Sequence, residues 1–429
     1  MVKQATLLSE LQSIVGKDHA REPRDERDCA VDGMSPQAVA EPGTYGEVAE
    51  VLRFANAGKL AVIPRGSGFF MHIGNIPSRY DIALSLVRLD KIIEHEPADM
   101  TVTCQAGVTI GRLQEHLSKS GQMVPFTPNR ADRATIGGLL ALNEGHMRLT
   151  YGAPRDFTIG LRVATVDGHL TKAGGKVVKN VAGYDLCKLY IGSLGTLGVI
   201  VEATFKLFPI PVAQERVDLE FPSIRDASDF VAALAHSGLA VTSMHASRPM
   251  RPAGDRFAPA AGFIAAIRFS GTARAVERSS HHVMALAAEK GIRGFDLEQL
   301  PEPGGKMPEW TSREFPLLCQ ASILPATVPA LAYAFEQEAP GPFITADLAG
   351  GLVSGEWLGA VDQTKLVERL RAATRKLGGS LVVRGCSPEL KREIDVFGQP
   401  PPSFPLMRAI KQQFDPNNVL SPGRFVGRL

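Results

Sequence analysis

The sequence lacks the cysteine spacing that a disulfide framework or a metal cluster requires. Its five cysteines are far apart and odd in number, and no Cys-x-x-Cys pair occurs. This pattern argues against a disulfide scaffold, a thiolate zinc site and an iron–sulfur cluster bound by this chain alone. We expect buried, unreactive thiols at the five positions, which are Cys29, Cys104, Cys187, Cys319 and Cys386.

An excess of one charge and a long apolar run are also missing. Lys and Arg number 47 against 45 Asp and Glu, and the basic residues are spread along the chain. This balance gives no electrostatic footprint for nucleic acid or for an anionic membrane. No apolar run approaches the roughly 20 residues of a bilayer span, and Leu7, Leu11 and Val15 have helical spacing unlike a signal peptide. We expect a cytoplasmic protein with no transmembrane segment, in which any membrane association comes through partner subunits.

The chain is too long for one hydrophobic core, so its 429 residues predict two or more domains. Residues 1–40 are expected to form an N-terminal helix and a linker. Strands and helices alternate from residue 41 to the Pro209 and Pro211 break, which predicts an α/β domain over 41–211. Residues 212–399 repeat a β-α-β-β-α pattern twice, which predicts a ferredoxin-like second domain. Residues 400–429, with a helix over Phe404–Phe414, are expected to return to the first domain.

Glycines gather in two loops that each follow an apolar run. The first is Pro64-Arg65-Gly66-Ser67-Gly68, and the second is Ala134-Thr135-Ile136-Gly137-Gly138, followed by Asn143-Glu144-Gly145. Glycine permits positive φ and close approach, so such loops can direct backbone N–H groups at a pyrophosphate. Neither is a Rossmann fingerprint, because Met71 stands where the first loop would need its third glycine. Each could be a plain tight turn, and Thr135 could simply cap a helix.

A third glycine cluster runs from Gly192 to Gly198, directly before the apolar strand Val199–Ala203. Glycines at three-residue spacing permit close packing of backbone on a flat ring. The same spacing is typical of a turn packed against a neighbouring helix, and the residues alone leave both interpretations open.

Several strings occur in the order in which a known flavoprotein family has them. They are Gly121–Phe126, Ala134–Gly138, Tyr151–Gly152 with Arg155–Asp156, Lys179–Asp185, Gly192–Gly198 and the tail Ser421–Phe425. By these strings the chain resembles the flavoproteins with the fold of vanillyl-alcohol oxidase and p-cresol methylhydroxylase (PCMH), and among them the FAD-binding E subunits of bacterial glycolate oxidase (glycolate dehydrogenase). The resemblance implies an α+β fold: a PCMH-type FAD-binding domain of two subdomains over 41–211, and a ferredoxin-like α/β cap domain over 212–399.

The resemblance also implies which residues bind noncovalent FAD. The first two loops would hold the pyrophosphate, residues 192–200 the adenine and ribose, and residues 151–156 a wall near the flavin. The cofactor-binding residues so implied are Pro64, Arg65, Gly66, Ser67, Gly68, Pro128, Ala134, Thr135, Gly137, Gly138, Glu144, Gly145, Tyr151, Gly152, Arg155, Asp156, Gly192, Gly195, Thr196, Gly198, Val199 and Ile200. The chain departs from the family at Phe69 and Phe70, which are bulky where phosphates approach, and at Ser421, where relatives carry asparagine.

Catalytic members of the family carry the string His-x-Gly-Asp-Gly-Asn-x-His, which supplies metal ligands and the base for the substrate hydroxyl. This string is absent, since none of the ten histidines lies beyond His282. His281 and His282 are adjacent in an expected helix, where their side chains point about 100° apart and make a poor metal site. We therefore assign no catalytic residue and no metal ligand. His72 follows the first loop, in a region where covalent attachment of FAD is conceivable, but most members bind FAD noncovalently.

These observations predict an FAD-dependent oxidoreductase subunit. It would carry flavin within a multi-subunit 2-hydroxy acid dehydrogenase or oxidase, with glycolate the expected substrate. The implied partners are a catalytic FAD-linked paralogous subunit and an iron–sulfur subunit of a glycolate oxidase-type complex. Two alternatives stay open: a self-contained FAD-linked 2-hydroxy acid oxidoreductase, and a non-catalytic flavin-fold assembly scaffold.

Overall fold

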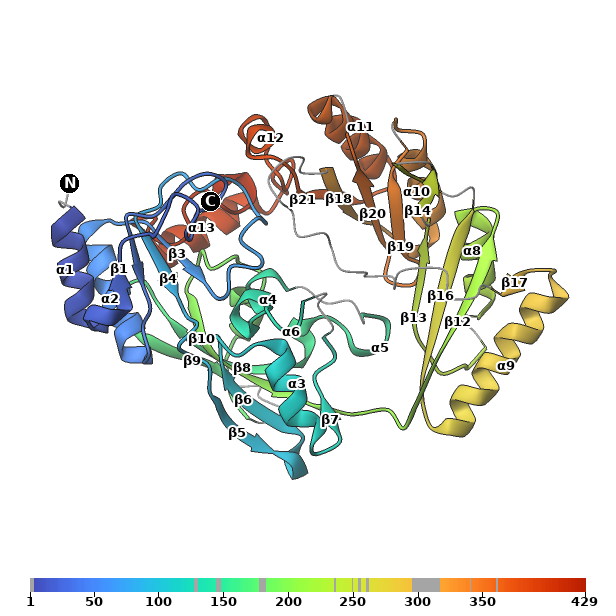
Figure 1. The fold of residues 1–429 in the computed structure, drawn as a ribbon, viewed down its shortest axis with the longest axis horizontal. Coiled ribbons are helices and arrows are strands. Elements are labelled where there is room, and N and C mark those ends of the chain that lie inside the picture. Colours follow the sequence, from blue (N-terminus) through green and yellow to red (C-terminus); the bar gives the residue numbers. More distant parts are fainter. Residues whose placement is uncertain are drawn as a thin grey trace. The chain divides into compact units, whose positions relative to one another are not determined.

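The chain forms two compact units. A computed structural model describes residues 4–126, 130–143, 148–176, 183–234, 237–248, 250–253, 256–259, 262–294, 317–339, 341–359 and 362–429. Unit 1 comprises Met1–His146, Tyr151–Ile210 and Asp395–Leu429, and unit 2 comprises Met147–Thr150 and Pro211–Ile394. Figure 1 traces their elements in sequence colours.

The first part of unit 1 is a small sheet covered by helices. Its strands run in the order β1-β2-β4-β3, and β2 and β3 both pair with β4 in parallel. The elements are α1 (Gln4–Val15), η1 (Lys17–His19), β1 (Ala20–Arg21), β2 (Ala38–Ala40), α2 (Tyr45–Gly58), β3 (Val62–Arg65) and β4 (Ile82–Ser85). The parallel strands end at the same edge, where the first glycine loop leaves β3.

Helix α2 shows why this part folds as its sequence suggests. Thr44 caps its N-terminus by accepting a hydrogen bond from the N–H of Glu47 (3.1 Å), while the Glu47 carboxylate accepts from the N–H of Gly43 (2.7 Å). Such reciprocal bonds satisfy amide groups that a helix start leaves unpaired. Val48, Leu52 and other residues at helical spacing are buried, and Lys59 ends the helix in a left-handed conformation.

The second part of unit 1 is an antiparallel sheet in the order β5-β6-β10-β8-β9. Its elements are β5 (Ile92–Glu96), η2 (Pro97–Asp99), β6 (Thr101–Gln105), α3 (Ile110–Ser118), β7 (Gln122–Met123), α4 (Ile136–Leu142), α6 (Pro154–Phe157), β8 (Thr158–Ala164), β9 (Leu170–Gly174), α7 (Cys187–Tyr190), β10 (Val199–Lys206) and β11 (Phe208–Pro209). α5 (Arg148–Tyr151) lies between α4 and α6 in the sequence. Strand β8 pairs with β9 in a hairpin that turns at Asp167-Gly168, where Gly168 has φ 81°.

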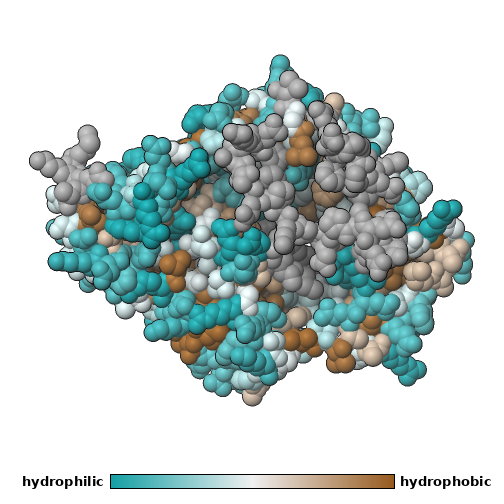
Figure 2. All heavy atoms as spheres, in the orientation of Figure 1, coloured by the Kyte–Doolittle hydropathy of each residue, from teal (hydrophilic) through white to brown (hydrophobic). Residues whose placement is uncertain are grey.

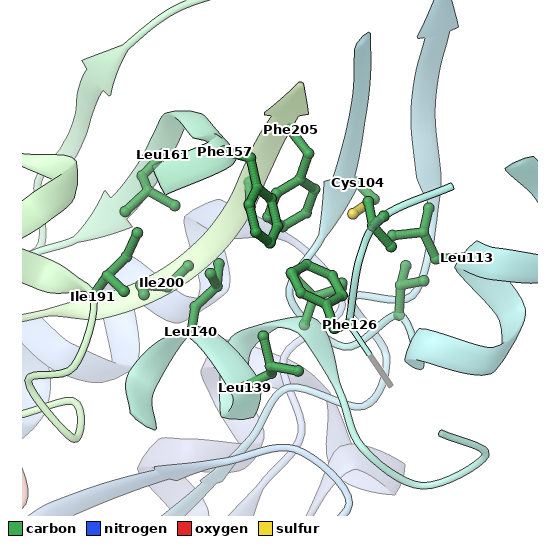
Figure 3. Packing of buried hydrophobic residues seen from close by; sticks show 14 of the residues in the cluster. Cys104, Leu113, Phe126, Leu139, Leu140, Phe157, Leu161, Ile191, Ile200 and Phe205 are labelled. Carbon is green, nitrogen blue, oxygen red and sulfur yellow. The ribbon is translucent and has the colours of Figure 1, made fainter. Parts of the chain in front are cut away.

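A hydrophobic core lies between this sheet and helices α3 and α4. The ring of Phe126 is 5.1 Å from that of Phe157 and 5.6 Å from that of Phe205, measured between centroids. Figure 3 shows these rings inclined to one another, with Leu139 of α4 beside Phe126. Burying one such side chain stabilises a fold by about 1.5–3 kcal/mol, so the core fixes α4 against the sheet.

The C-terminal segment completes unit 1 with α13 (Phe404–Phe414) and η5 (Val426–Arg428). Leu420 forms a parallel bridge with Val62 of β3, so the tail extends the first sheet. Lys411 of α13 is buried, and its Nζ donates to the Asp415 carboxylate (2.5 Å) and to the carbonyl of Thr196 (2.9 Å). The hydrogen bond to Thr196 ties the C-terminal helix to the third glycine cluster, and the ion pair with Asp415 compensates the buried charge of Lys411.

Unit 2 contains two consecutive βαββαβ motifs. The first holds β12 (Ala213–Phe221), α8 (Ile224–Leu234), β13 (Val241–Ser247), β16 (Phe263–Gly271), α9 (Ala273–Glu289) and β17 (Arg293–Gly294), with β14 (Met250–Ala253) and β15 (Arg256–Pro259) as an inserted hairpin. The second holds β18 (Leu317–Ser322), η4 (Pro325–Thr327), α10 (Val328–Glu336), β19 (Phe343–Asp347), β20 (Leu352–Trp357), α11 (Gln363–Lys376) and β21 (Ser380–Gly385), followed by α12 (Pro388–Glu393). The strands form one sheet in the order β17-β12-β16-β13-β19-β20-β18-β21, joined where β13 pairs with β19.

This strand order confirms the ferredoxin-like prediction and the α+β class. The expected helices Ala273–Glu289 and Phe404–Phe414 begin and end at those residues in α9 and α13. Strand β20 is the third strand of the second β-α-β-β-α repeat, and it contains Gly355. A side chain there would meet the ring of Trp357 at 2.6 Å and that of Phe335 at 2.9 Å, so glycine is required by packing.

The thiol prediction holds for four of the five cysteines, which are buried, whereas Cys29 is half-buried. Burial raises the pKa of Cys187 to about 11 and raises the pKa values of Cys104 and Cys319 further. Their thiols are therefore protonated and poorly nucleophilic near neutral pH.

The molecular surface mixes residue types on the face that Figure 2 shows. Hydrophobic residues there occur in small groups separated by hydrophilic ones. Of the helices within the described ranges, none has both the length and the apolar character needed to cross a membrane.

Candidate functional site

A cavity in unit 1 brings the three glycine clusters together. It encloses about 820 Å³, its open mouth included. Of the candidate residues, those that line it are Pro64, Arg65, Gly66, Ser67, Gly68, Thr135, Gly137, Gly138, Gly195, Gly198, Val199 and Ile200. Segments more than 50 residues apart in the sequence therefore share one wall.

The first loop leaves β3 and turns at Gly68, which has φ 85°. The Ser67 hydroxyl donates to the carbonyl of Arg133 (2.7 Å), which joins this loop to the segment before α4. Phe69 and Phe70 meet edge to face with centroids 4.8 Å apart, and both line the cavity. The two bulky residues are thus part of its wall and pack on the core behind it.

The second loop is the start of α4, capped by Thr135, whose Oγ1 accepts from the N–H of Gly138 (3.4 Å). The cap prediction is confirmed, but Gly137 and Gly138 do not have positive φ. Close packing explains these glycines instead. A Cβ on Gly137 would lie 3.0 Å from that of Ala106, and one on Gly66 would lie 2.8 Å from Thr135 Cγ2. The glycines let the two loops touch.

The third cluster is both a turn on a helix and a cavity wall. The N–H groups of Gly192 and Leu194 donate to the carbonyls of Leu140 (2.9 Å) and Ala141 (3.0 Å) at the end of α4. Gly192 and Gly195 have φ of 85° and 70°, as a tight turn requires. From the sequence, Gly192–Gly198 could be a turn packed against a helix or a segment packed on a flat ring. The position of the cluster in the structure is compatible with both interpretations.

Other candidate residues lie outside the cavity lining. These are Ala134, Tyr151, Gly152, Arg155, Asp156, Gly192 and Thr196. The Asp156 carboxylate accepts from the N–H of Ala153 (2.7 Å), and the ring of Tyr151 packs on that of Phe208 at 4.9 Å. Pro128, Glu144 and Gly145 fall outside the described residues. Two of the ten histidines, His146 and His236, also fall outside the described residues.

The string Lys179–Asp185 is described only from Gly183 onward. Tyr184 is 96% exposed, so it does not fill a hydrophobic core. The Asp185 carboxylate accepts from the N–H of Cys187 (3.1 Å), the first residue of α7, whose N-cap position is Leu186.

Charge in the cavity has one sign among the described lining residues. Arg65 and Arg424 are the charged ones, and no Asp or Glu accompanies them. Arg424 was not among the candidates, although it stands in the tail string Ser421–Phe425. Burial lowers the pKa of Arg424, while the charges of Asp32 and Tyr80 oppose this shift. Ser421 also lines the cavity and was missed as a contact.

One histidine in the part of the chain that the structure describes pairs with an acidic residue, since His169 Nδ1 lies 2.9 Å from Asp167 at the surface. No group of three or more His, Cys, Asp or Glu side chains there could hold a metal ion. His281 and His282 are exposed on α9, as expected, and His245 is half-buried on β13. His72 does not line the cavity.

Comparison with known proteins identifies the group that such a cavity accepts. Residues 36–174 match the "FAD binding domain" family, and residues 392–425 match "FAD linked oxidases, C-terminal domain". The chain is 28% identical over 410 residues to the D-lactate dehydrogenase of Archaeoglobus fulgidus, covering 91% of each chain. It is 27% identical over 422 residues to the glycolate oxidase subunit GlcD of Bacillus subtilis, covering 92% of this chain and 89% of that one.

Solved structures show the same fold. The chain superposes on p-cresol methylhydroxylase with a TM-score of 0.72 at 16% identity, covering 98% of this chain and 96% of that one. An alkyldihydroxyacetonephosphate synthase gives 0.71 at 18% identity, covering 98% and 86%. The expected PCMH-type fold is confirmed.

The cavity residues fit FAD. Glycines bring two loops into contact at the point where a side chain would separate them, and two guanidinium groups face a lining without carboxylates. Phe69, Phe70 and Leu142 offer apolar surface for a planar ring. A dinucleotide needs these features, namely backbone approach, positive charge and an apolar slot.

Proposed function

We propose that this chain, which belongs to the FAD-dependent oxidoreductases, is the flavin-carrying subunit of a multi-subunit 2-hydroxy acid dehydrogenase. The similarity to a D-lactate dehydrogenase and to a glycolate oxidase subunit, over about nine-tenths of the chain, carries this proposal. By their names, these relatives act on small 2-hydroxy acids. Glycolate is the substrate that we propose for the assembled complex.

The residues of the first two loops would bind the pyrophosphate, and residues 192–200 the adenine and ribose. Bound FAD supplies a two-electron acceptor that no side chain can replace. The apolar lining side chains Phe69, Phe70, Met71 and Ile73 would then exclude water from the ring. Unit 1 therefore accounts for cofactor binding with its own residues.

FAD is expected to be noncovalent, because no His, Cys or Tyr appears among the described residues that line the cavity. Acid precipitation of the purified protein should release a yellow supernatant with the FAD spectrum. A colourless supernatant over a yellow pellet would show covalent attachment and contradict this expectation.

The absence of a recognisable catalytic string supports the subunit role. The sequence has no His-x-Gly-Asp-Gly-Asn-x-His, and none of its histidines follows His282. Asp347 is the last residue of β19, and its Oδ1 accepts from the N–H of Gly350 (2.7 Å) in the turn that follows. This bond uses one carboxylate oxygen of Asp347 to close the turn.

Electron transfer onward also points to partners. The five cysteines are scattered over the sequence and cannot supply the four thiolates of a cluster without a fold that gathers them. We propose a catalytic FAD-linked paralogue that oxidises the substrate and an iron–sulfur subunit that receives the electrons.

A self-contained dehydrogenase is the second candidate, favoured by the match to a D-lactate dehydrogenase over 91% of both chains. A dye-linked assay with glycolate and D-lactate separates the two. The chain alone should show no activity, and co-expression with the paralogue and iron–sulfur protein from the same genome should give activity. Activity of the chain alone would favour the second candidate.

A further inference from the structure

Two buried polar atoms in the C-terminal turn have no hydrogen-bond partner within the described residues. They are the hydroxyl Oγ of Ser421 and the guanidinium Nη1 of Arg424. Ser421 is 1% exposed and Arg424 is 3% exposed. A buried donor left unpaired is costly, and more so when it carries charge. Because both residues line the FAD cavity, a bound ligand is the partner that they would meet.

The turn is held in place by other bonds of the same residues. The N–H of Ser421 donates to the carbonyl of Val62 on β3 (2.9 Å). Arg424 uses its second terminal nitrogen, Nη2, to donate to the carbonyls of Met71 (2.9 Å) and Ile73. The backbone of the turn and one half of the guanidinium are therefore fixed by the fold, and the other half remains for a ligand.

The geometry of the turn is specialised for this position. Ser421 has φ 44° and Gly423 has φ 84°, both in the left-handed region. A Cβ on Gly423 would lie 2.9 Å from the backbone nitrogen of Ser78. A left-handed conformation is unfavourable for serine, so the surrounding bonds hold Ser421 where its hydroxyl faces the cavity wall near Gly195.

The chemistry of these atoms selects an anionic, oxygen-rich ligand group. A guanidinium nitrogen and a hydroxyl both donate hydrogen bonds, and the described lining residues include no carboxylate, although the charge of Asp32 acts on Arg424 from outside the lining. Of the parts of FAD, the pyrophosphate carries the negative charge. Charge-assisted bonds from Arg to phosphate are stronger than neutral ones, and they are strongest away from water.

We propose that the turn Ser421–Arg424 is a fourth element of the FAD site, in which Arg424 Nη1 binds the pyrophosphate and Ser421 Oγ donates to the same ligand. The three glycine clusters then supply backbone groups, and the C-terminal tail supplies the cation. This proposal rests on the FAD assignment and is independent of the substrate class, so it can fail while the proposed function stands.

Flavin titration of the apoprotein tests it. Arg424→Met removes the charge at similar length and should weaken FAD binding by about 10- to 100-fold, the range expected for a charge-assisted bond. Arg79→Met is the matched control. Arg79 also donates to two backbone carbonyls, of Lys59 (2.7 Å) and of Asn418 (2.8 Å) in the tail, but does not line the cavity. The Arg79→Met variant should therefore bind FAD with nearly the affinity of the wild type.

Two further variants separate binding from folding. Arg424→Lys keeps the charge and should bind FAD more tightly than Arg424→Met. Ser421→Ala removes an unpaired hydroxyl, so the melting temperature of the apoprotein should stay the same or rise, while FAD affinity falls by about 2- to 10-fold.

The proposal is overturned if Ser421→Ala leaves FAD affinity unchanged, or if Arg424→Lys and Arg424→Met weaken binding equally. It is also overturned if Arg79→Met weakens binding as much as Arg424→Met, because the tail would then act only through its attachment. Ser421→Ala keeps the test decisive if both Arg424 variants fail to fold.

Discussion

Replacing Gly137 by valine is expected to remove most FAD binding from this protein. Gly137 lies in the first turn of α4, where its N–H donates to the carbonyl of Ala106 (2.8 Å). A Cβ would lie 3.0 Å from that of Ala106, and valine would add two methyl groups at the same place. Overpacking of this kind costs about 1–3 kcal/mol, so α4 must shift and FAD affinity should fall by about 10- to 100-fold.

The measurement is the flavin content of the purified variant, followed by FAD titration. Gly175→Val is the control, because nothing lies within 4 Å of a Cβ at Gly175 and its φ is not positive. A folded Gly137→Val variant with the full flavin content of the wild type would show that the approach of α4 to Ala106 does not shape the site.

Lys411→Met is expected to have the largest effect on stability. Lys411 is 6% exposed and Asp415 is 2% exposed, and removal of the cation leaves the Asp415 carboxylate buried without its counter-charge. Backbone N–H groups of Val419 and Leu420 still donate to that carboxylate, but they carry no full charge. Breaking one side of a buried ion pair costs about 3–5 kcal/mol.

Urea unfolding followed by the fluorescence of released FAD reports on unit 1 and measures this loss. Arg112→Met is the control, since Arg112 and Asp90 form an exposed ion pair (2.6 Å) whose removal should change the unfolding free energy by less than about 1 kcal/mol. If Lys411→Met also changes the unfolding free energy by less than about 1 kcal/mol, the buried bonds of Lys411 do not hold the tail to the third glycine cluster.

Local patterns predicted much of the fold because the determining interactions are local. Helix α2 has its cap at Thr44 and its apolar stripe in one continuous segment, and α9 has the same features. The reason for Gly355 in β20 could not be read from the sequence, because Trp357 and Phe335 meet this glycine only in the folded sheet.

The site was predictable in part for a related reason. Glycine-rich loops in the sequence predict places where the backbone can pack closely against a neighbour or a ligand. Gly137, however, is needed for close contact with Ala106 and not for positive φ. Ser421 and Arg424 could not be assigned from composition or spacing, because they lie more than 200 residues from the other cavity residues. Only the fold, through the bridge between Leu420 and Val62, brings the tail to the cavity.

Anaerobic absorption spectroscopy of the isolated, FAD-loaded chain tests the central claim most directly. The claim is that this chain carries flavin for an assembly but does not oxidise the 2-hydroxy acid itself. Addition of glycolate or D-lactate should leave the oxidised flavin spectrum unchanged, and a chemical reductant should then bleach it, which shows that the flavin is competent. Rapid bleaching by either hydroxy acid would contradict the claim and identify a self-contained dehydrogenase.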